Sequence, residues 1–106
     1  DMDSIYASLP HPDDFEEYLN ENKEWYFNLC YTKIKDNFEG EKLETVELMT
    51  FTFEDEESTV YDITVSQEDF ILNLGNCLNH YEDVEDYVTC SKINKLIKEI
   101  EMYYGL

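Results

Sequence analysis

The sequence predicts one α+β domain, residues 1–106, with a three-stranded antiparallel sheet, helices on one face of it, and the element order α-β-β-β-α-α. Length and composition support a single domain. The 106 residues are 42% hydrophobic and 15% aromatic, enough to build one core but not two. Hydrophobic periodicity supports the element order, because it changes from helical to two-residue spacing near residue 25 and back near residue 66.

The first helix is expected at residues 12–22, with Pro12 at the first helical position. Phe15, Tyr18 and Leu19 follow one another at i, i+3 and i+4, which places them on one face. Acidic side chains fill the first turns, where the helix dipole favours anions. The segment is therefore predicted to be a short amphipathic helix that opens the domain.

Three segments in which apolar side chains alternate are predicted to be strands. They cover residues 25–32, residues 43–53 and residues 61–65. The connections are a turn-rich segment at 35–41 and an acidic one at 54–58, so the strands should form an antiparallel meander. The side chains expected on the inner face are Trp25, Phe27, Leu29, Tyr31, Met49, Phe51, Phe53, Tyr61, Ile63 and Val65.

Two helices are predicted in the C-terminal part. The first covers residues 70–81, and an acidic stretch then opens a short helical turn that ends near Cys90. The second helix is expected to begin at Ser91. Their apolar stripes have helical spacing and consist of Phe70, Ile71, Leu74, Cys77, Leu78 and Tyr81 in the first helix, and of Ile93, Leu96, Ile97, Ile100 and Tyr104 in the second.

The charge is the most informative property of the chain. There are 26 Asp and Glu residues against 7 Lys and no Arg, a formal net charge of -19. Solubility needs a net charge of only about 2 to 8 in a small domain, so a selected negative surface is the better explanation. Direct nucleic-acid binding is disfavoured because phosphate neutralisation requires Lys and Arg. Anionic membranes would repel the chain as well. The expected partner is a basic nucleic-acid-binding protein.

The sequence contains few residues suited to catalysis or to metal binding. His11 is expected to be a solvated residue, and His80 follows Cys77 by three positions on one helix face. A metal site would need further ligands, for which Cys30 and Cys90 are the only thiol candidates. We therefore expect no catalytic residue, no metal and no cofactor. The odd number of cysteines and the absence of a signal-peptide or membrane-span pattern predict a reduced, cytoplasmic protein.

Two acidic clusters are the candidate partner-binding sites. Carboxylates on one face of a strand lie roughly 6.7 Å apart, and those one helical turn apart lie about 6 Å apart, so either arrangement can approximate a row of phosphates. Tyr is a common interface anchor. The predicted contact residues are Glu54, Asp55, Glu56 and Glu57 in the first cluster, and Tyr81, Glu82, Asp83, Glu85, Asp86 and Tyr87 in and beside the second.

These segments resemble small acidic phage-encoded anti-CRISPR proteins that mimic DNA. The resemblance rests on residues 53–61, on the segment from Tyr81 to Tyr87 and on the predicted element order, and it covers the C-terminal two-thirds of the chain. It implies a non-catalytic inhibitor that acts in the cytoplasm of a bacterial host cell, where its carboxylates contact the arginines with which a type II CRISPR nuclease reads the duplex motif beside its target.

Several alternatives remain open at this stage. The target could instead be a restriction enzyme, a DNA-repair enzyme such as a uracil glycosylase, or a nucleoid protein. The chain could also be an immunity protein that neutralises a nuclease toxin, or an acidic accessory domain without mimicry. The sequence leaves open whether the protein is a monomer or a homodimer.

Overall fold

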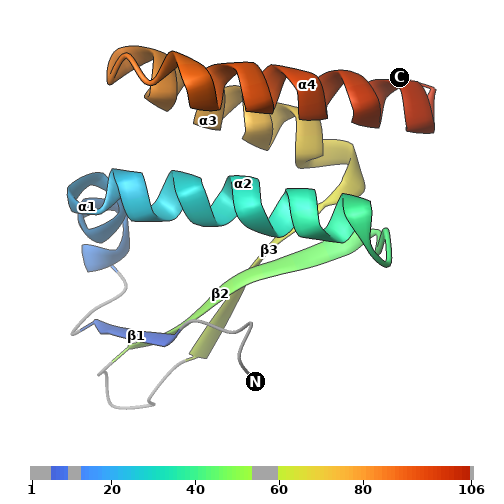
Figure 1. The fold of residues 1–106 in the computed structure, drawn as a ribbon. Helices are drawn as coiled ribbons and strands as arrows, with labels where there is room; N and C mark the ends of the chain where they lie inside the picture. The colour runs from blue at the N-terminus through green and yellow to red at the C-terminus, as the bar shows by residue number, and fades with distance from the viewer. Residues whose placement is uncertain (1–5, 10–12, 54–59, 106) are drawn as a thin grey trace.

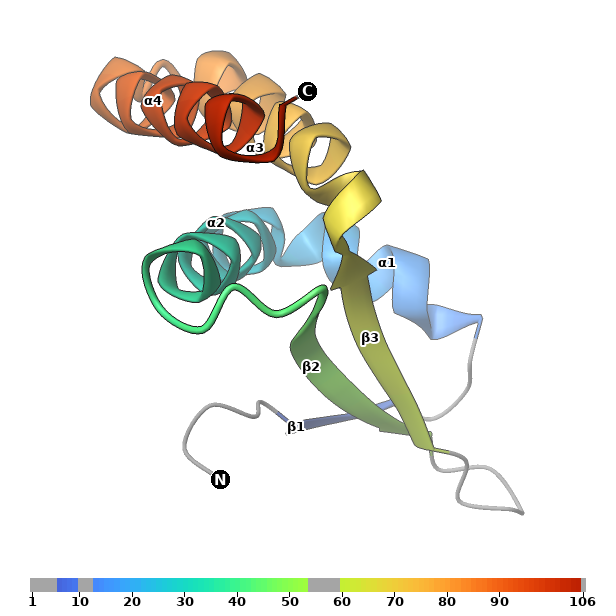
Figure 2. The same ribbon diagram turned by 90° about the vertical axis from the view of Figure 1, so that its right-hand side faces the viewer.

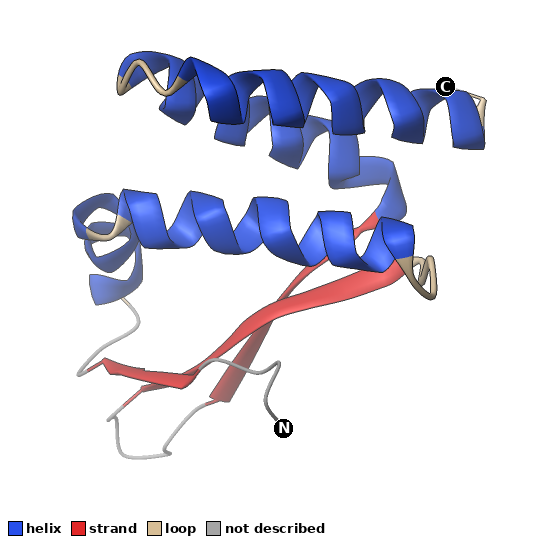
Figure 3. Ribbon diagram, viewed as in Figure 1, coloured by secondary structure: helices blue, strands red, loops and turns tan. Residues whose placement is uncertain are grey.

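The computed structural model describes residues 6–9, 13–53 and 60–105. Figures 1 and 3 show the elements, which are β1 (Tyr6–Leu9), α1 (Asp14–Glu21), α2 (Lys23–Glu39), β2 (Thr45–Phe53), β3 (Val60–Ser66), the 3-10 turn η1 (Gln67–Asp69), α3 (Phe70–Asp83) and α4 (Tyr87–Tyr104). The domain is α+β, but after β1 the order is α-α-β-β-α-α, so the predicted order α-β-β-β-α-α is wrong.

The sheet also differs from the prediction. Its antiparallel part has two strands, β2 and β3, so the predicted three-stranded antiparallel meander is wrong. The short strand β1 lies on the other side of β2 and runs parallel to it, with Tyr6 opposite Thr50 and Leu9 opposite Phe53. Parallel neighbours need a long crossover connection, and α1 and α2 supply it.

The main error concerns residues 25–32, which belong to helix α2 and not to a strand. The alternation was misleading because Tyr26 and Cys30, which lie between the presumed inward residues, are apolar or aromatic as well. The pattern that decides the structure has a spacing of four, from Tyr26 through Cys30 and Ile34 to Phe38. The helix continues through the presumed connector and ends at Glu39, before Gly40.

The elements form layers. Helix α2 lies against the sheet, and α3 and α4 form a hairpin on the far side of α2 (Figures 1 and 2). Helix α1 packs on β2, where the fully buried ring of Phe51 meets Phe15 and Tyr18 edge-on at centroid distances of 4.7 and 5.5 Å. The core therefore joins the sheet to all the helical layers.

The burial predicted for β2 and the position predicted for α3 are confirmed. Met49, Phe51, Phe53 and Val65 are buried, but Tyr61 is 48% exposed and not directed into the core. A bulge at Leu48, between Glu47 and Met49, interrupts the alternation of β2, in which the four successive residues from Leu48 to Phe51 are buried. Helix α3 lies where it was expected, whereas α4 begins at Tyr87 as one continuous helix and not at Ser91.

Within the described ranges, none of the helices combines the length and the apolar character that crossing a lipid bilayer requires.

Candidate acidic docking surface

The connection between α3 and α4 is short and internally bonded. The backbone N–H of Glu85 donates to the carbonyl of Glu82 at 3.0 Å, and that of Asp86 donates to the carbonyl of Tyr81 at 2.9 Å. The side chains of Glu82, Asp83 and Glu85 are exposed, and that of Asp86 is half-buried. The turn thus presents four carboxylates from a backbone whose conformation is fixed.

Asp86 has a structural role within this cluster. Its carboxylate accepts hydrogen bonds from the hydroxyl of Thr89 at 2.7 Å and from the backbone N–H of Thr89 at 3.1 Å, which caps helix α4. These hydrogen bonds, the side-chain bond foremost, lower the pKa of Asp86 below its ordinary value. The carboxylate is therefore ionised at neutral pH and held in one orientation.

Other features of the same turn are unfavourable for folding. Glu82 and Asp83 lie in the last turn of α3, where the helix dipole disfavours anions. Glu85 has φ 59°, in the left-handed region, which costs a residue with a side chain about 1 to 2 kcal/mol. Backbone strain of this kind often persists where function requires it. Three of the four carboxylates, those of Glu82, Asp83 and Glu85, thus occupy positions that are unfavourable for local stability, whereas Asp86 stabilises the start of α4.

A second group of carboxylates lies at the same end of the molecule. Glu24, at the start of α2, accepts hydrogen bonds from His80 Nε2 at 3.0 Å and from the Tyr81 hydroxyl at 3.3 Å, which ties this helix start to the end of α3. Helix α1 lies at this end too (Figures 1 and 2). We call this region the acidic end and define it by Asp14, Glu16, Glu17, Glu21, Glu24, Glu82, Asp83, Glu85 and Asp86.

The structure places the predicted tyrosines differently. Tyr81 is 2% exposed, so its ring belongs to the core, and its role at the surface is to position Glu24. Burial, followed by the charge of Glu24, raises the pKa of the Tyr81 phenol. Tyr87, by contrast, is 63% exposed at the start of α4. The first predicted cluster, Glu54, Asp55, Glu56 and Glu57, lies outside the described residues.

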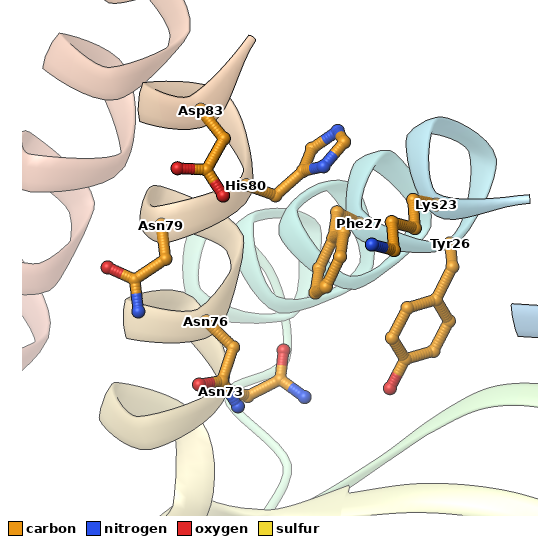
Figure 4. A pocket seen from close by; sticks show the side chains of 8 residues that line it. All are labelled: Lys23, Tyr26, Phe27, Asn73, Asn76, Asn79, His80 and Asp83. Atoms are coloured by element: carbon orange, nitrogen blue, oxygen red, sulfur yellow. The ribbon is translucent and has the colours of Figure 1, made fainter. Parts of the chain in front are cut away.

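An open groove of about 350 Å³ runs between α2 and α3 beside the acidic end (Figure 4). Asn73, Asn76 and Asn79 line one wall, and Phe27 forms part of the other. The ring of His80 stacks on Phe27 at a centroid distance of 4.8 Å, and its Nε2 bonds to Glu24. The groove thus offers amide and carboxylate oxygens, aromatic faces and the ammonium group of Lys23 to a ligand or partner (Figure 4).

Two thiols lie beneath this groove. Cys30 and Cys77 are fully buried, and Cys77 Sγ lies 3.6 Å from the backbone carbonyl of Phe27. A hydrogen bond between the two thiols, together with burial, raises the pKa of Cys77 and keeps it protonated, which makes it a poor nucleophile. Among the described residues, no three His, Cys, Asp or Glu side chains are grouped so as to hold a metal ion, and Cys77 and His80 do not form such a site.

The contact residues predicted from the sequence did not include five carboxylates of the acidic end, those of Asp14, Glu16, Glu17, Glu21 and Glu24, or the exposed Val84 and Val88 beside it. Glu24 was assigned to the region before a strand, and only the helical spacing of Tyr26, Cys30 and Ile34 would have placed it next to His80. Val84 and Val88 were passed over because they lie among acidic residues, yet they are 53% and 68% exposed.

A comparison of the chain with protein-family models, with curated proteins and with solved structures finds no match in any of the three. The candidate surface is therefore interpreted from its own geometry and charge.

Proposed function

We propose that this protein is a non-catalytic inhibitor that mimics nucleic acid and occupies the basic nucleic-acid-binding site of a bacterial defence protein. The observation that carries the proposal is the acidic end: the elements that carry these nine carboxylates, α1, the start of α2, the end of α3 and the α3–α4 turn, lie at the same end of the molecule (Figure 1). Duplex DNA presents about one negative charge per 1.7 Å of its axis, so a partner built for DNA would attract such a surface strongly.

Charge neutralisation within the chain cannot remove this potential. Even if each of the 7 lysines paired with a different one of the 26 carboxylates, 19 carboxylates would remain. Two of the lysines are paired along the helices, Lys35 with Glu39 on α2 and Lys95 with Glu99 on α4. The negative potential is therefore available to a partner.

The first target to test is a type II CRISPR nuclease. Two features that carry the resemblance to anti-CRISPR proteins, the acidic segments around residues 54–57 and 82–86, are properties of the sequence itself. The third, the predicted element order, is wrong for this chain. The target class is consequently chosen on charge chemistry, and other basic nucleic-acid-binding enzymes belong in the same experiment.

The experiment measures binding to purified proteins at about 0.05 and 0.5 M salt, across which the Debye length falls severalfold from more than 10 Å. The proteins are a guide-loaded type II CRISPR nuclease, a restriction endonuclease, a uracil-DNA glycosylase and a nuclease toxin domain. Mimicry predicts tight binding at low salt, loss of affinity at high salt, and competition by duplex DNA. Failure of all four to bind, or binding that is indifferent to salt and DNA, would overturn the proposal.

A pair of triple variants separates a local surface from net charge alone. Glu82→Gln, Asp83→Asn and Glu85→Gln remove three charges from the acidic end and keep the side-chain shapes. Glu41→Gln, Glu44→Gln and Glu68→Gln remove three exposed charges elsewhere. The first triple should slow association by about tenfold or more, because steering depends on charges near the contact. Equal losses in both triples would contradict a defined docking surface.

A further inference from the structure

An exposed apolar patch lies within the acidic end. Val84 directly follows α3, and Tyr87 and Val88 begin α4; their exposed fractions are 53%, 63% and 68%. Val84 opens the turn between the two helices, and Tyr87 and Val88 follow it. Their neighbours in the sequence are the acidic residues Glu82, Asp83, Glu85 and Asp86. We call these three residues the turn patch.

Folding does not account for the turn patch. The buried stripe of α4 consists of Cys90, Ile93, Leu96 and Ile100, and Tyr87 and Val88 lie outside it. A single exposed apolar residue is ordinary, but adjacent ones bordered by charge resemble the centre and rim of a protein interface. Phosphate mimicry alone would not require apolar side chains at this place, since DNA-like attraction comes from the carboxylates.

We propose that the turn patch inserts into an apolar depression on the partner protein whose rim carries Arg or Lys. The proposal rests on the proposed function and names the contact that would make inhibition specific to one protein. Charge complementarity favours a partner of this chemistry, because the exposed side chains of Glu82, Asp83 and Glu85 lie next to Val84 in the same turn. A second copy of this chain would bring the same carboxylates into opposition, and an anionic lipid surface would be repelled.

The two parts of the surface should act on different steps of binding. The carboxylates steer the encounter, so they set the association rate and its dependence on salt. The turn patch is uncharged and is covered only in the complex, so it sets the dissociation rate and is insensitive to salt. Tyr87 is the expected anchor, because Tyr combines a large apolar ring with a polar tip at binding hot spots.

The test compares two double variants that remove similar exposed apolar side chains. Tyr87→Ser with Val88→Ser removes the centre of the patch. The control, Leu72→Ser with Met102→Ser, changes residues 67% and 84% exposed at other places. Met102 lies 14 residues beyond Val88, about 21 Å along α4. The probes are the four purified proteins named above, and thermal unfolding of the free variants checks that both remain folded.

The turn patch predicts that the first double variant dissociates at least about tenfold faster while its salt dependence stays that of the wild type, and that the control behaves like the wild type. If the first double variant binds like the wild type while the acidic-end triple loses binding, the inference is overturned and the proposed function stands. If no probe binds the wild-type protein, both are overturned.

Discussion

Replacement of Phe51 by Ala tests how the first helix is held on the sheet. The Phe51 ring is fully buried on β2 and contacts Phe15 and Tyr18 of α1 and Phe53 of its own strand, at centroid distances of 4.7, 5.5 and 6.4 Å. Loss of such a ring removes buried surface and leaves a cavity, which costs about 3 to 5 kcal/mol. For 106 residues the unfolding entropy is about 220 cal/mol/K, so the melting temperature should fall by about 13 to 22 °C.

Urea denaturation followed by circular dichroism and by the fluorescence of Trp25 measures the loss. Trp25, the single tryptophan, packs edge-on against Tyr18 at 6.0 Å and therefore reports the docking of α1. Leu43→Ala is the matched control, because the Leu43 side chain is 51% exposed just before β2 and should change stability by no more than about 0.5 kcal/mol. A loss below about 1 kcal/mol for Phe51→Ala would refute the assignment of this ring to the core.

Three further substitutions test local features. Thr32→Ala, at an exposed position inside α2, should stabilise the protein by about 0.5 kcal/mol in thermal melts because Ala is the better helix former, and a loss of stability would favour a strand there. Asp86 has a pKa below its ordinary value, so its contribution to stability is complete above the normal carboxyl range and is lost as the pH falls through the lower folded-state pKa. Asp86→Ala should therefore reduce the loss of stability that acid causes, as measured by unfolding across this pH range. An unchanged pH dependence would contradict the capping role of Asp86. Glu85→Gly should raise the free energy of unfolding by about 1 kcal/mol by relieving the left-handed backbone, and a decrease would show that the Glu85 side chain contributes to folding.

The sequence predicted the fold best where one periodicity was clear. Helix α3 could be recognised because its apolar residues follow only helical spacing, and the inner face of β2 was correct at Met49, Phe51 and Phe53. The strand prediction for residues 25–32 was wrong because large aromatic and apolar side chains occur there at both alternating and helical spacings. In the structure the helical spacing prevails, since a continuous helix of 17 residues buries Leu29, Cys30 and Ile34 together.

The candidate surface was predictable only in its local part. The carboxylates between residues 82 and 86 are adjacent in the sequence and stay together in the turn. The association of Glu24 with His80 joins residues 56 positions apart, and it depends on α2 packing against α3, which the strand assignment excluded. Tyr81 shows the same limit, because its place in the buried stripe of α3 decides that its ring faces the core while its hydroxyl reaches Glu24.

A folded core and a strongly negative surface together give salt two opposite effects. Added salt screens the repulsion among the carboxylates of the free protein, whose neighbours in the α3–α4 turn lie within the Debye length of roughly 8 Å at physiological ionic strength, so the free protein should become more stable. The same screening weakens attraction to a basic partner, so the complex should become less stable. An unfolded acidic chain would show only the second effect, because it has no packed core to be stabilised. A free protein that salt stabilises, together with a complex that salt weakens, therefore identifies a folded domain whose surface carboxylates repel one another.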